Sequence, residues 1–259
     1  MTKASATSAG RSARREPRQT KLERYFARVP QRARAARPRR APIVAARGDV
    51  VALWDASRTA LAAWEAAGFV AHYVFSLDAA TALDPPPVFA CAFPDSTDLS
   101  IAGARWFSQK RARNPHFQEL AAAVFWDTEA LFRRWGCPYF VEGPAVGRLA
   151  RLWRPPDLTY NPCDYGGYLD ARDDHPQHPG IIPRRDAYTR FSGLWVGSGF
   201  RPPAQRAVEP AWRYYYSARH RAQRRMNPVL FARGDEGRRA RACPPRGFVR
   251  GVCLRLTRS

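Results

Sequence analysis

Continuous apolar runs of strand length recur between residues 49 and 144, and they predict strands that are buried on both faces. Three of them are DVVALW (49–54), PVFACAF (87–93) and PYFVEGP (138–144), and none alternates regularly with polar residues as a half-exposed strand does. A fourth run, FVAHYVFSLD (69–78), predicts a strand that ends on an acid. Runs of this kind are typical of parallel sheets.

Two segments between these runs have the spacing of helices, SRTALAAWEAAG (57–68) and FQELAAAVFWDTEALFRRWG (117–136). Each ends in a glycine, Gly68 or Gly136, which suits a helix C-cap. The order strand, helix, strand, strand, helix, strand predicts a doubly wound α/β fold, which binds ligands at the carboxyl ends of its strands. The acidic and hydroxyl residues expected at these ends are Asp55, Asp78, Asp95, Ser96 and Glu142.

Charge divides the chain into three parts. Residues 1–48 hold 14 Lys and Arg against 2 Asp and Glu, residues 201–259 hold 15 against 3, and residues 49–200 hold 14 against 17. Because the first part has few large apolar residues, we predict a disordered basic tail there and a folded domain over residues 49–259. Basic ends around a slightly acidic centre suit a protein that grips DNA. A general excess of Arg is the alternative, but it would not leave the centre net acidic.

Several classes of protein are disfavoured. No apolar run reaches the roughly 18 residues of a membrane span, and the N-terminus has no apolar core of a signal peptide. We therefore expect an intracellular, soluble monomer with no membrane partner, working at DNA in the nucleus or at the site of genome replication. Five cysteines without a Cys-x-x-Cys pair indicate neither a disulfide framework nor a zinc site. We interpret DDHPQHP (173–179) as a solvated turn rather than a metal site.

One island of apolar residues interrupts the basic tail, QTKLERYF (19–26). A single helical turn would place its aliphatic residue and both aromatics on one face, as a plug for a partner's pocket. The segment resembles the PCNA-interacting peptide, which implies that the protein binds a sliding clamp. The alternative is an amphipathic turn that packs on the protein's own core. The residues that carry the resemblance are Gln19, Leu22, Tyr25 and Phe26.

Seven motifs follow one another between about residues 49 and 252. They are LWDASRTALAAWEAAGF (53–69), FSLD (75–78), FPDSTDLSIAGARWF (93–107), VEGP (141–144), PPDLTYNPCDYGGYL (155–169), DAYTRFSGLW (186–195) and RRARACPPRGF (238–248). In this order they resemble the blocks of the cytosine carbon-5 DNA methyltransferases. The likeness is to the short phage-type members, whose nucleophile loop ends in a Gly-Ala-Arg-Trp run.

The resemblance implies a Rossmann-like, S-adenosylmethionine-dependent methyltransferase domain with a short target-recognition region at about 198–238. It implies that the first motif binds the cofactor and that the acid of FSLD holds its ribose. It also implies that the third and fourth motifs and Arg190 form the cytosine site. The implied cofactor-binding residues are Trp54, Asp55, Ser57, Asp78 and Pro94, and the implied catalytic residues are Asp95, Ser96, Glu142 and Arg190.

The chain departs from the family at the nucleophile. Asp95 and Ser96 stand where the family carries a Pro-Cys pair. Carbon-5 methylation needs a thiolate that adds to the ring, and a serine hydroxyl without a neighbouring histidine is far less acidic than a thiol. Cys91 lies five residues earlier, inside an apolar run, and we expect it to be a small buried side chain.

Other departures leave several functions open. Ala56 and Arg58 replace glycines of the cofactor loop, and Gly143 replaces an asparagine after Glu142. The protein could methylate the exocyclic amine of cytosine, with Asp95 orienting the amine hydrogens. It could be an inactive homologue that binds DNA and a sliding clamp. Carbon-5 methylation through an unusual nucleophile is a third reading, and a cofactor with an extra acidic group that meets Arg58 is a further variant.

The segment WRYYYSARHRAQRR (212–225) interleaves aromatic residues with arginines. This composition suits stacking on bases combined with phosphate contacts. A basic helix that packs its tyrosines inward would have the same composition.

Overall fold

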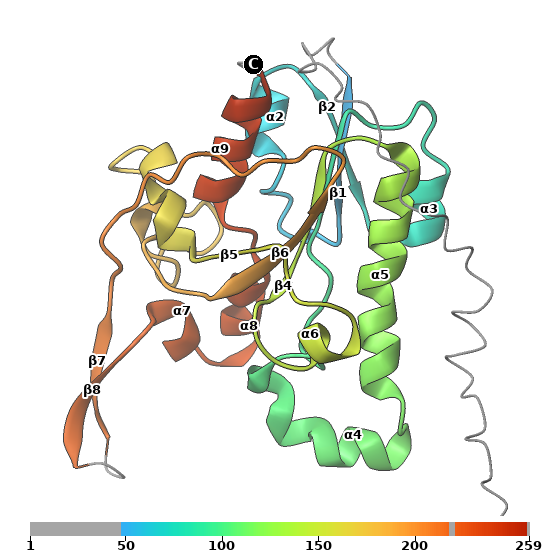
Figure 1. Ribbon diagram of the computed structural model, residues 1–259. Coiled ribbons are helices and arrows are strands. Elements are labelled where there is room, and N and C mark those ends of the chain that lie inside the picture. The colour runs from blue at the N-terminus through green and yellow to red at the C-terminus, as the bar shows by residue number, and fades with distance from the viewer. Residues whose placement is uncertain (1–47, 218–220, 258–259) are drawn as a thin grey trace, which may run out of the picture. The chain divides into compact units, whose positions relative to one another are not determined.

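Six strands form one sheet in the computed structural model, which describes residues 48–217 and 221–257 (Figure 1). The segment 19–26 and almost all of the basic tail lie outside these residues. The sheet order is β2 (Val70–Val74), β1 (Asp49–Leu53), β3 (Phe89–Ala92), β4 (Tyr139–Pro144), β6 (Ser192–Gly197) and β5 (Leu158–Tyr160). The first four strands are parallel, whereas β6 runs antiparallel to both β4 and β5. The predicted α/β class and its mostly parallel sheet are confirmed.

The central strands are apolar over most of their length, with Asp49 in β1 and Glu142 in β4 as the acidic exceptions, because both faces of the sheet are covered. In β1, Val50 and Ala52 enter one core together with Phe140, while Val51 and Leu53 enter the other. All four β1 residues are fully buried. Alternate residues of a strand point to opposite faces, so a strand between two cores shows no polar positions.

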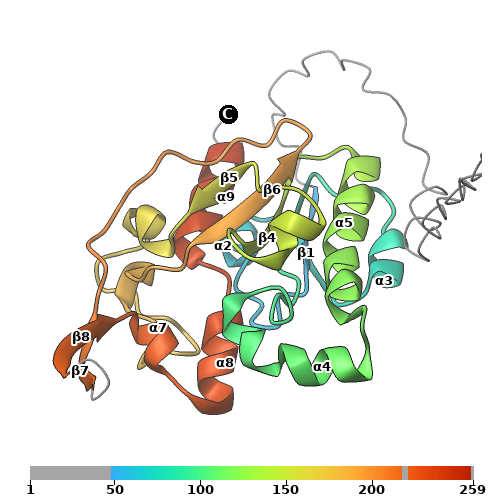
Figure 2. The ribbon, with the colours of Figure 1, turned by 60° about the horizontal axis from the view of Figure 1, so that its bottom comes forward.

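Helices cover the two faces unequally (Figures 1 and 2). On one face lie α2 (Ala62–Ala66) and α9 (Arg246–Thr257), which contact each other. On the other face the long α5 (Phe117–Trp135) contacts α3 (Leu77–Thr81) and α6 (Arg148–Leu152). The remaining helices are α4 (Phe107–Arg113), α7 (Pro228–Phe231), α8 (Gly234–Ala242) and the 3₁₀ helices η1 (Ile101–Trp106), η2 (Pro162–Tyr168) and η3 (Arg184–Asp186). None of the helices in residues 48–217 and 221–257 is long and apolar enough to cross a membrane.

The glycine that ends α5 acts as predicted. Gly136 is the C-cap residue, with a φ of 73°, and its amide donates to the carbonyl of Phe132. This left-handed conformation is one that glycine adopts without strain.

Two predicted boundaries are wrong. The strand predicted over residues 69–78 ends at Val74, and residues 77–81 form α3 instead. Ser76 caps that helix by accepting a hydrogen bond from the amide of Ala79 at 3.1 Å, which competes with continuation of the strand. Asp78 therefore lies exposed in the first turn of a helix rather than at a strand end. The helix predicted over residues 57–68 is reduced to α2.

A two-stranded antiparallel ribbon accounts for the aromatic and basic segment. It consists of β7 (Arg213–Ser217) and β8 (Ala222–Met226), which pair only with each other. The helical alternative for residues 212–225 is wrong. In Figures 1 and 2 the ribbon extends away from the six-stranded sheet beside α7.

Candidate functional site

The sheet has a topological switch point between β1 and β3. From β1 the chain goes first to β2 on one side and then to β3 on the other. In doubly wound sheets, ligands bind at the carboxyl ends of the two strands that flank such a point. The segments that leave these ends are Trp54–Ala60 after β1 and Phe93–Ser100 after β3.

Asp55 organises the loop after β1. Its side chain is almost fully buried, and Oδ1 accepts hydrogen bonds from the amide (3.0 Å) and hydroxyl (2.5 Å) of Ser57. Oδ2 accepts from the amides of Thr59 (2.9 Å) and Ala60 (2.8 Å). Both oxygens are thus engaged within the loop, and Asp55 shapes a candidate ligand loop through its backbone.

This loop contains two large residues with a left-handed backbone. Trp54 has a φ of 59° and Arg58 a φ of 53°, and such conformations are costly for side chains with a Cβ. Arg58 thus keeps a glycine-type conformation at a position where the resembled family has glycine. Tyr73 supports it, because its hydroxyl donates to the carbonyl of Arg58 (2.9 Å) and accepts from the amide of Leu61 (3.3 Å).

A short turn forms the loop after β3. Asp95 is exposed, and its Oδ1 accepts from both the amide (2.8 Å) and the hydroxyl (2.6 Å) of Thr97. A Cβ on Gly103 would lie 1.9 Å from the carbonyl oxygen of Thr97, so only glycine lets η1 approach the turn this closely. The glycine of the Gly-Ala-Arg-Trp run therefore has a structural reason, because it lets η1 pack against the carbonyl of Thr97.

The nucleophile position is not activated. Ser96 is half-buried, and no side chain in residues 48–217 or 221–257 hydrogen-bonds to its hydroxyl. Cys91 is fully buried in β3, as predicted. Burial raises the pKa of its thiol well above the usual value, and Asp55 and Glu142 raise it further. Neither the Ser96 hydroxyl nor the Cys91 thiol is therefore activated as a nucleophile.

Glu142 in β4 and Arg190, two residues before β6, form an ion pair in which the carboxylate is buried and the guanidinium is partly buried. Arg190 Nη2 donates to Glu142 Oε1 at 2.7 Å, and the hydroxyl of Ser192 donates to the same oxygen at 2.7 Å. Arg190 Nη1 donates to the carbonyls of Arg241 (2.7 Å) and Cys243 (3.2 Å). Burial lowers the pKa of Arg190, but Glu142 and neighbouring groups outweigh this and raise it above its ordinary value. The guanidinium is therefore charged and fixed from two sides.

Three buried polar atoms around this pair have no hydrogen-bond partner among the described residues. They are Oε2 of Glu142, Nε of Arg190 and the hydroxyl oxygen of Tyr160. Burial raises the pKa of Tyr160 well above its usual value, with Glu142 adding to this and Arg190 opposing it. An unsatisfied buried polar group costs about 1–3 kcal/mol, so such groups mark places where a ligand or water completes the hydrogen bonding.

Tyr160 and Cys243 were not identified as site residues from the sequence. Burial raises the pKa of the Cys243 thiol to about 11, while the Ser57 hydroxyl lowers it and Asp55 raises it. Its carbonyl accepts a hydrogen bond from Arg190 at 3.2 Å, so Cys243 lies beside the ion pair. The motif RRARACPPRGF was a usable signal for Cys243, whereas a tyrosine ending the short run LTY carries none for Tyr160.

Gly143 explains one departure from the resembled family. A Cβ at this position would lie 2.8 Å from the Phe125 ring, 2.9 Å from Leu149 and 3.0 Å from the Trp195 ring. These side chains fill the space that an asparagine would need. The strand therefore packs tightly beside Glu142 without a side chain at the next position.

The histidines of DDHPQHP are not in a solvated turn, so that interpretation is wrong for them. His175 and His178 are buried, with ring centroids 5.5 Å apart. Gln177 Nε2 donates to the carbonyl of Ser57 at 2.7 Å, so this segment lies against the loop after β1. Within residues 48–217 and 221–257, no His, Cys, Asp and Glu side chains form a group of three or more that could hold a metal ion.

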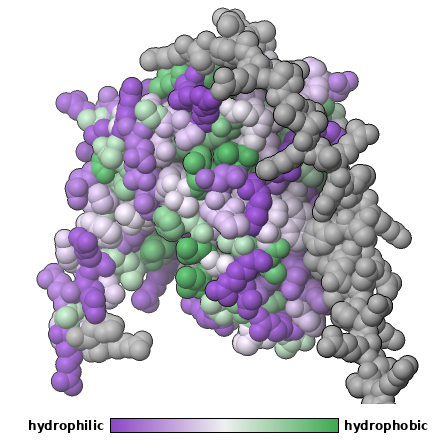
Figure 3. All heavy atoms as spheres, in the orientation of Figure 1, coloured by the Kyte–Doolittle hydropathy of each residue, from purple (hydrophilic) through white to green (hydrophobic). Residues whose placement is uncertain are grey.

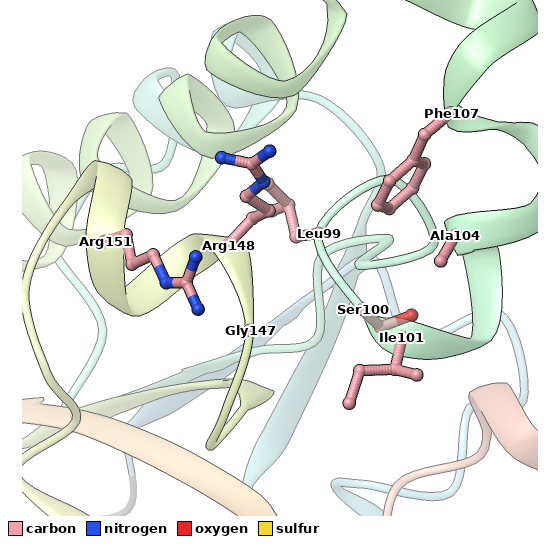
Figure 4. A pocket seen from close by; sticks show the side chains of 8 residues that line it. All are labelled: Leu99, Ser100, Ile101, Ala104, Phe107, Gly147, Arg148 and Arg151. Atoms are coloured by element: carbon pink, nitrogen blue, oxygen red, sulfur yellow. The ribbon is translucent and has the colours of Figure 1, made fainter.

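A small cavity of about 140 Å³ lies beside the loop after β3 (Figure 4). Figure 4 shows Arg148 and Arg151 on one side of it and Ile101 and Phe107 on the other. Its other lining residues are Leu99, Ser100, Ala104 and Gly147. It combines an apolar surface with two exposed guanidinium groups at the mouth of the loop.

Hydrogen bonds join the implied residues in two pairs, Asp55 with Ser57 in the loop after β1 and Glu142 with Arg190. Cys243 contacts Arg190 through its carbonyl, and Pro94 is buried two residues after β3. Asp78 is separate from this group of contacts. Comparisons of the chain with models of protein families, with curated proteins and with solved structures found no match.

Proposed function

We propose that this protein is a DNA cytosine methyltransferase-like enzyme that uses S-adenosylmethionine and modifies the exocyclic amine of cytosine. The observation that carries the proposal is Glu142: a buried carboxylate fixed through Oε1 to Arg190, with Oε2 unpartnered. A carboxylate is the natural acceptor for the amine of cytosine, and a guanidinium complements the base's oxygen. Two charged groups held in this way select a small polar ring.

The cofactor would occupy the carboxyl ends of β1 and β3. Three features fit a loop that a ligand contacts closely. They are its position at the switch point, the strained backbone at Trp54 and Arg58, and the half-buried hydroxyl of Ser57. Trp54, Ser57 and Pro94 would contact it, and Asp55 would hold the loop in place. S-adenosylmethionine supplies an electrophilic methyl group when bound.

The amine is favoured over carbon 5 because the chain has no activated thiol at the site. Cys91 is buried with a raised pKa, and nothing among the described residues activates Ser96. Amine methylation needs no covalent adduct: the amine nitrogen would take the methyl group as the bond between that carbon and the sulfonium sulfur breaks, the sulfur would leave as a neutral thioether, and the nitrogen would then give up a proton. Glu142 would orient the amine, and the exposed carboxylate of Asp95 would accept that proton.

A non-catalytic function is the second candidate. The observation that favours it is Asp95, whose Oδ1 is already held by Thr97 in a turn. A carboxylate oxygen that already accepts two hydrogen bonds within its own turn is less available to bind the amine of a substrate. In this case the protein would be an inactive homologue that binds DNA and a sliding clamp.

Two measurements test the proposal. Calorimetric titration with S-adenosylmethionine should show binding if the pocket is intact and none if it has decayed. Treated DNA, digested and analysed by mass spectrometry, should contain cytosine methylated on the exocyclic nitrogen. Glu142→Gln should lower the yield roughly a hundredfold or more, since it removes the charge at the same size. Asp170→Asn, which removes the charge of an exposed carboxylate outside the seven motifs, is the matched control and should leave the yield unchanged. Cofactor binding without any methylated base would favour the non-catalytic candidate.

A further inference from the structure

The β7–β8 ribbon has two chemically different faces. Its register pairs Tyr214 with Arg225 and Tyr216 with Gln223. Since paired residues and those two apart along a strand share a face, these four side chains form one surface, here called the outer face. Tyr215 and its partner Arg224 lie on the opposite, inner face.

Contacts show which face is turned toward the protein. On the inner face, the ring of Tyr215 lies 6.2 Å from that of Phe231 in α7. On the outer face, Tyr214 is 63% exposed and Tyr216 is 69% exposed. Arg225 is held on this face because its guanidinium lies 4.4 Å from the ring centroid of Trp212. The outer face is thus ordered and open.

The spacing of the two exposed tyrosines fits a flat ring between them. Residues two apart on a strand are separated by about 6.8 Å, which is about twice the 3.4 Å rise between stacked bases. A single nucleobase placed between the two rings would contact both at normal stacking distance. Aromatic side chains that hold bases in this way contribute to single-strand binding without a need for a particular sequence.

Charge on the ribbon selects a polyanion. Its described residues include four arginines, Arg213, Arg221, Arg224 and Arg225, and no Asp or Glu. In Figure 3 the projection formed by this part of the chain is coloured mostly as hydrophilic, without a large apolar patch for a protein partner. Arginines beside stacking surfaces are the combination found in single-strand binding sites.

We propose that the outer face of the ribbon binds single-stranded DNA, with one unpaired base between Tyr214 and Tyr216 and the backbone near Arg225. This rests on the proposed function only in taking DNA as the substrate, and it names the form of that DNA. A ribbon also fits the major groove of a duplex, where Arg and Gln read base edges. The duplex is disfavoured because the two most exposed side chains of this face offer stacking surfaces, and paired bases expose no ring face to them.

The test measures binding of the full-length protein to a dye-labelled oligonucleotide by fluorescence anisotropy. The DNA probes are a mixed-sequence single strand, the corresponding duplex, and a strand with a central abasic stretch, and an RNA strand of the same sequence is measured beside them. We expect the intact single strand to bind most tightly. Tyr214→Ala or Tyr216→Ala should each weaken its binding about tenfold, and the Phe variants should leave it unchanged because the ring remains. Arg224→Ala, on the inner face, should weaken the binding of the three DNA probes by a similar factor.

Two results identify stacking specifically. The alanine variants should lose little affinity for the abasic strand, since no base is present to stack. A Phe variant that binds the intact single strand as weakly as the Ala variant would overturn the proposal. Tighter binding to the duplex, or to an RNA strand of the same sequence, would also overturn it. These outcomes are independent of methylation, so an inactive protein that still binds single strands through its tyrosines would refute the enzyme and leave this inference standing.

Discussion

At the scale of single residues, the most informative feature is a carboxylate that is buried and only half satisfied. Glu142 accepts two hydrogen bonds on one oxygen and none on the other. By contrast, Asp55 uses both oxygens inside its own loop. Both acids follow or end buried strands, but only the first retains a free acceptor for a ligand.

The two residues at the nucleophile position should differ in their effect. If the amine is methylated, Asp95→Ala should remove most activity, because the proton acceptor and an orienting group are lost, whereas Ser96→Ala should largely spare it. Mass spectrometry of digested DNA would measure both. Carbon-5 methylcytosine that depends on Ser96 would show that the assignment is wrong.

Asp186 should make stability depend on pH. It is almost fully buried, and burial raises its pKa to about 6, although its carboxylate accepts a hydrogen bond from the amide of Gly247 at 2.8 Å. Since the folded state holds this proton more tightly than the unfolded state, protonated Asp186 contributes favourably to the free energy of unfolding at low pH. This contribution is lost as the pH rises from about 4 to about 6.

Asp186→Asn keeps an acceptor for the amide but removes the titration. As the pH rises from 4 to 7, the free energy of unfolding of the variant should therefore increase by on the order of 2 kcal/mol relative to that of the unchanged protein. Urea unfolding at several pH values would measure this difference. The comparison cancels the opposing effect of His175, whose pKa burial lowers to about 4. A constant difference across the range would contradict the prediction.

At the scale of elements, close packing rather than hydrogen bonding determines how the strands present the site. β4 carries Glu142 and, next to it, Gly143, where three side chains from α5, α6 and β6 converge. The loop after β3 is closed in a similar way by Gly103 against the carbonyl of Thr97. Backbone approach at these two glycines holds the site residues in position.

Introducing the asparagine of the resembled family should therefore harm this protein. Gly143→Asn forces a Cβ within 3.0 Å of three buried side chains and should cost about 1–3 kcal/mol of unfolding free energy. Gly143→Ala, as a smaller control, should cost less. Thermal and urea unfolding would measure both, and an asparagine variant as stable as the unchanged protein would disprove the packing explanation.

At the scale of the whole molecule, strongly basic parts of the chain lie on either side of a slightly acidic central part in the sequence. Residues 201–259 are strongly basic, and exposed Arg148 and Arg151 line the cavity beside the nucleophile loop. The buried Glu142–Arg190 pair, by contrast, is neutral in sum. DNA would thus be attracted over a wide surface and contacted selectively at one small site.

The tail gives a prediction for a second partner. Tyr25→Ala together with Phe26→Ala should abolish binding to a purified sliding clamp, because buried aromatic anchors supply most of the affinity of short peptides. The fold of residues 49–259 should be unaffected, as circular dichroism would show. Arg28→Ala, beside the motif, is a matched control that should change binding little. Undiminished binding by the double variant would exclude the tail as the clamp ligand.

The elements that could be predicted are those with a strong local pattern. β1, β3 and β4 were located within two residues, because a strand buried on both faces is apolar without interruption. The ribbon was not predicted, since alternating aromatics and arginines fit a basic helix as well as a strand. The segment 75–78 was placed in a strand because its local helix cap was not recognised.

By itself, the sequence determined the α/β class, the order of the central elements and the identity of the acids near strand ends, because these follow from local periodicity and chain order. Only the tertiary structure decided which of these acids retain a free oxygen. Both oxygens of Asp55 accept hydrogen bonds within its own loop, and Asp78 lies on α3. Glu142 pairs with Arg190, which lies 48 residues later in the chain. Such pairing depends on contacts between distant parts of the chain, and local patterns carry no information about where those contacts fall.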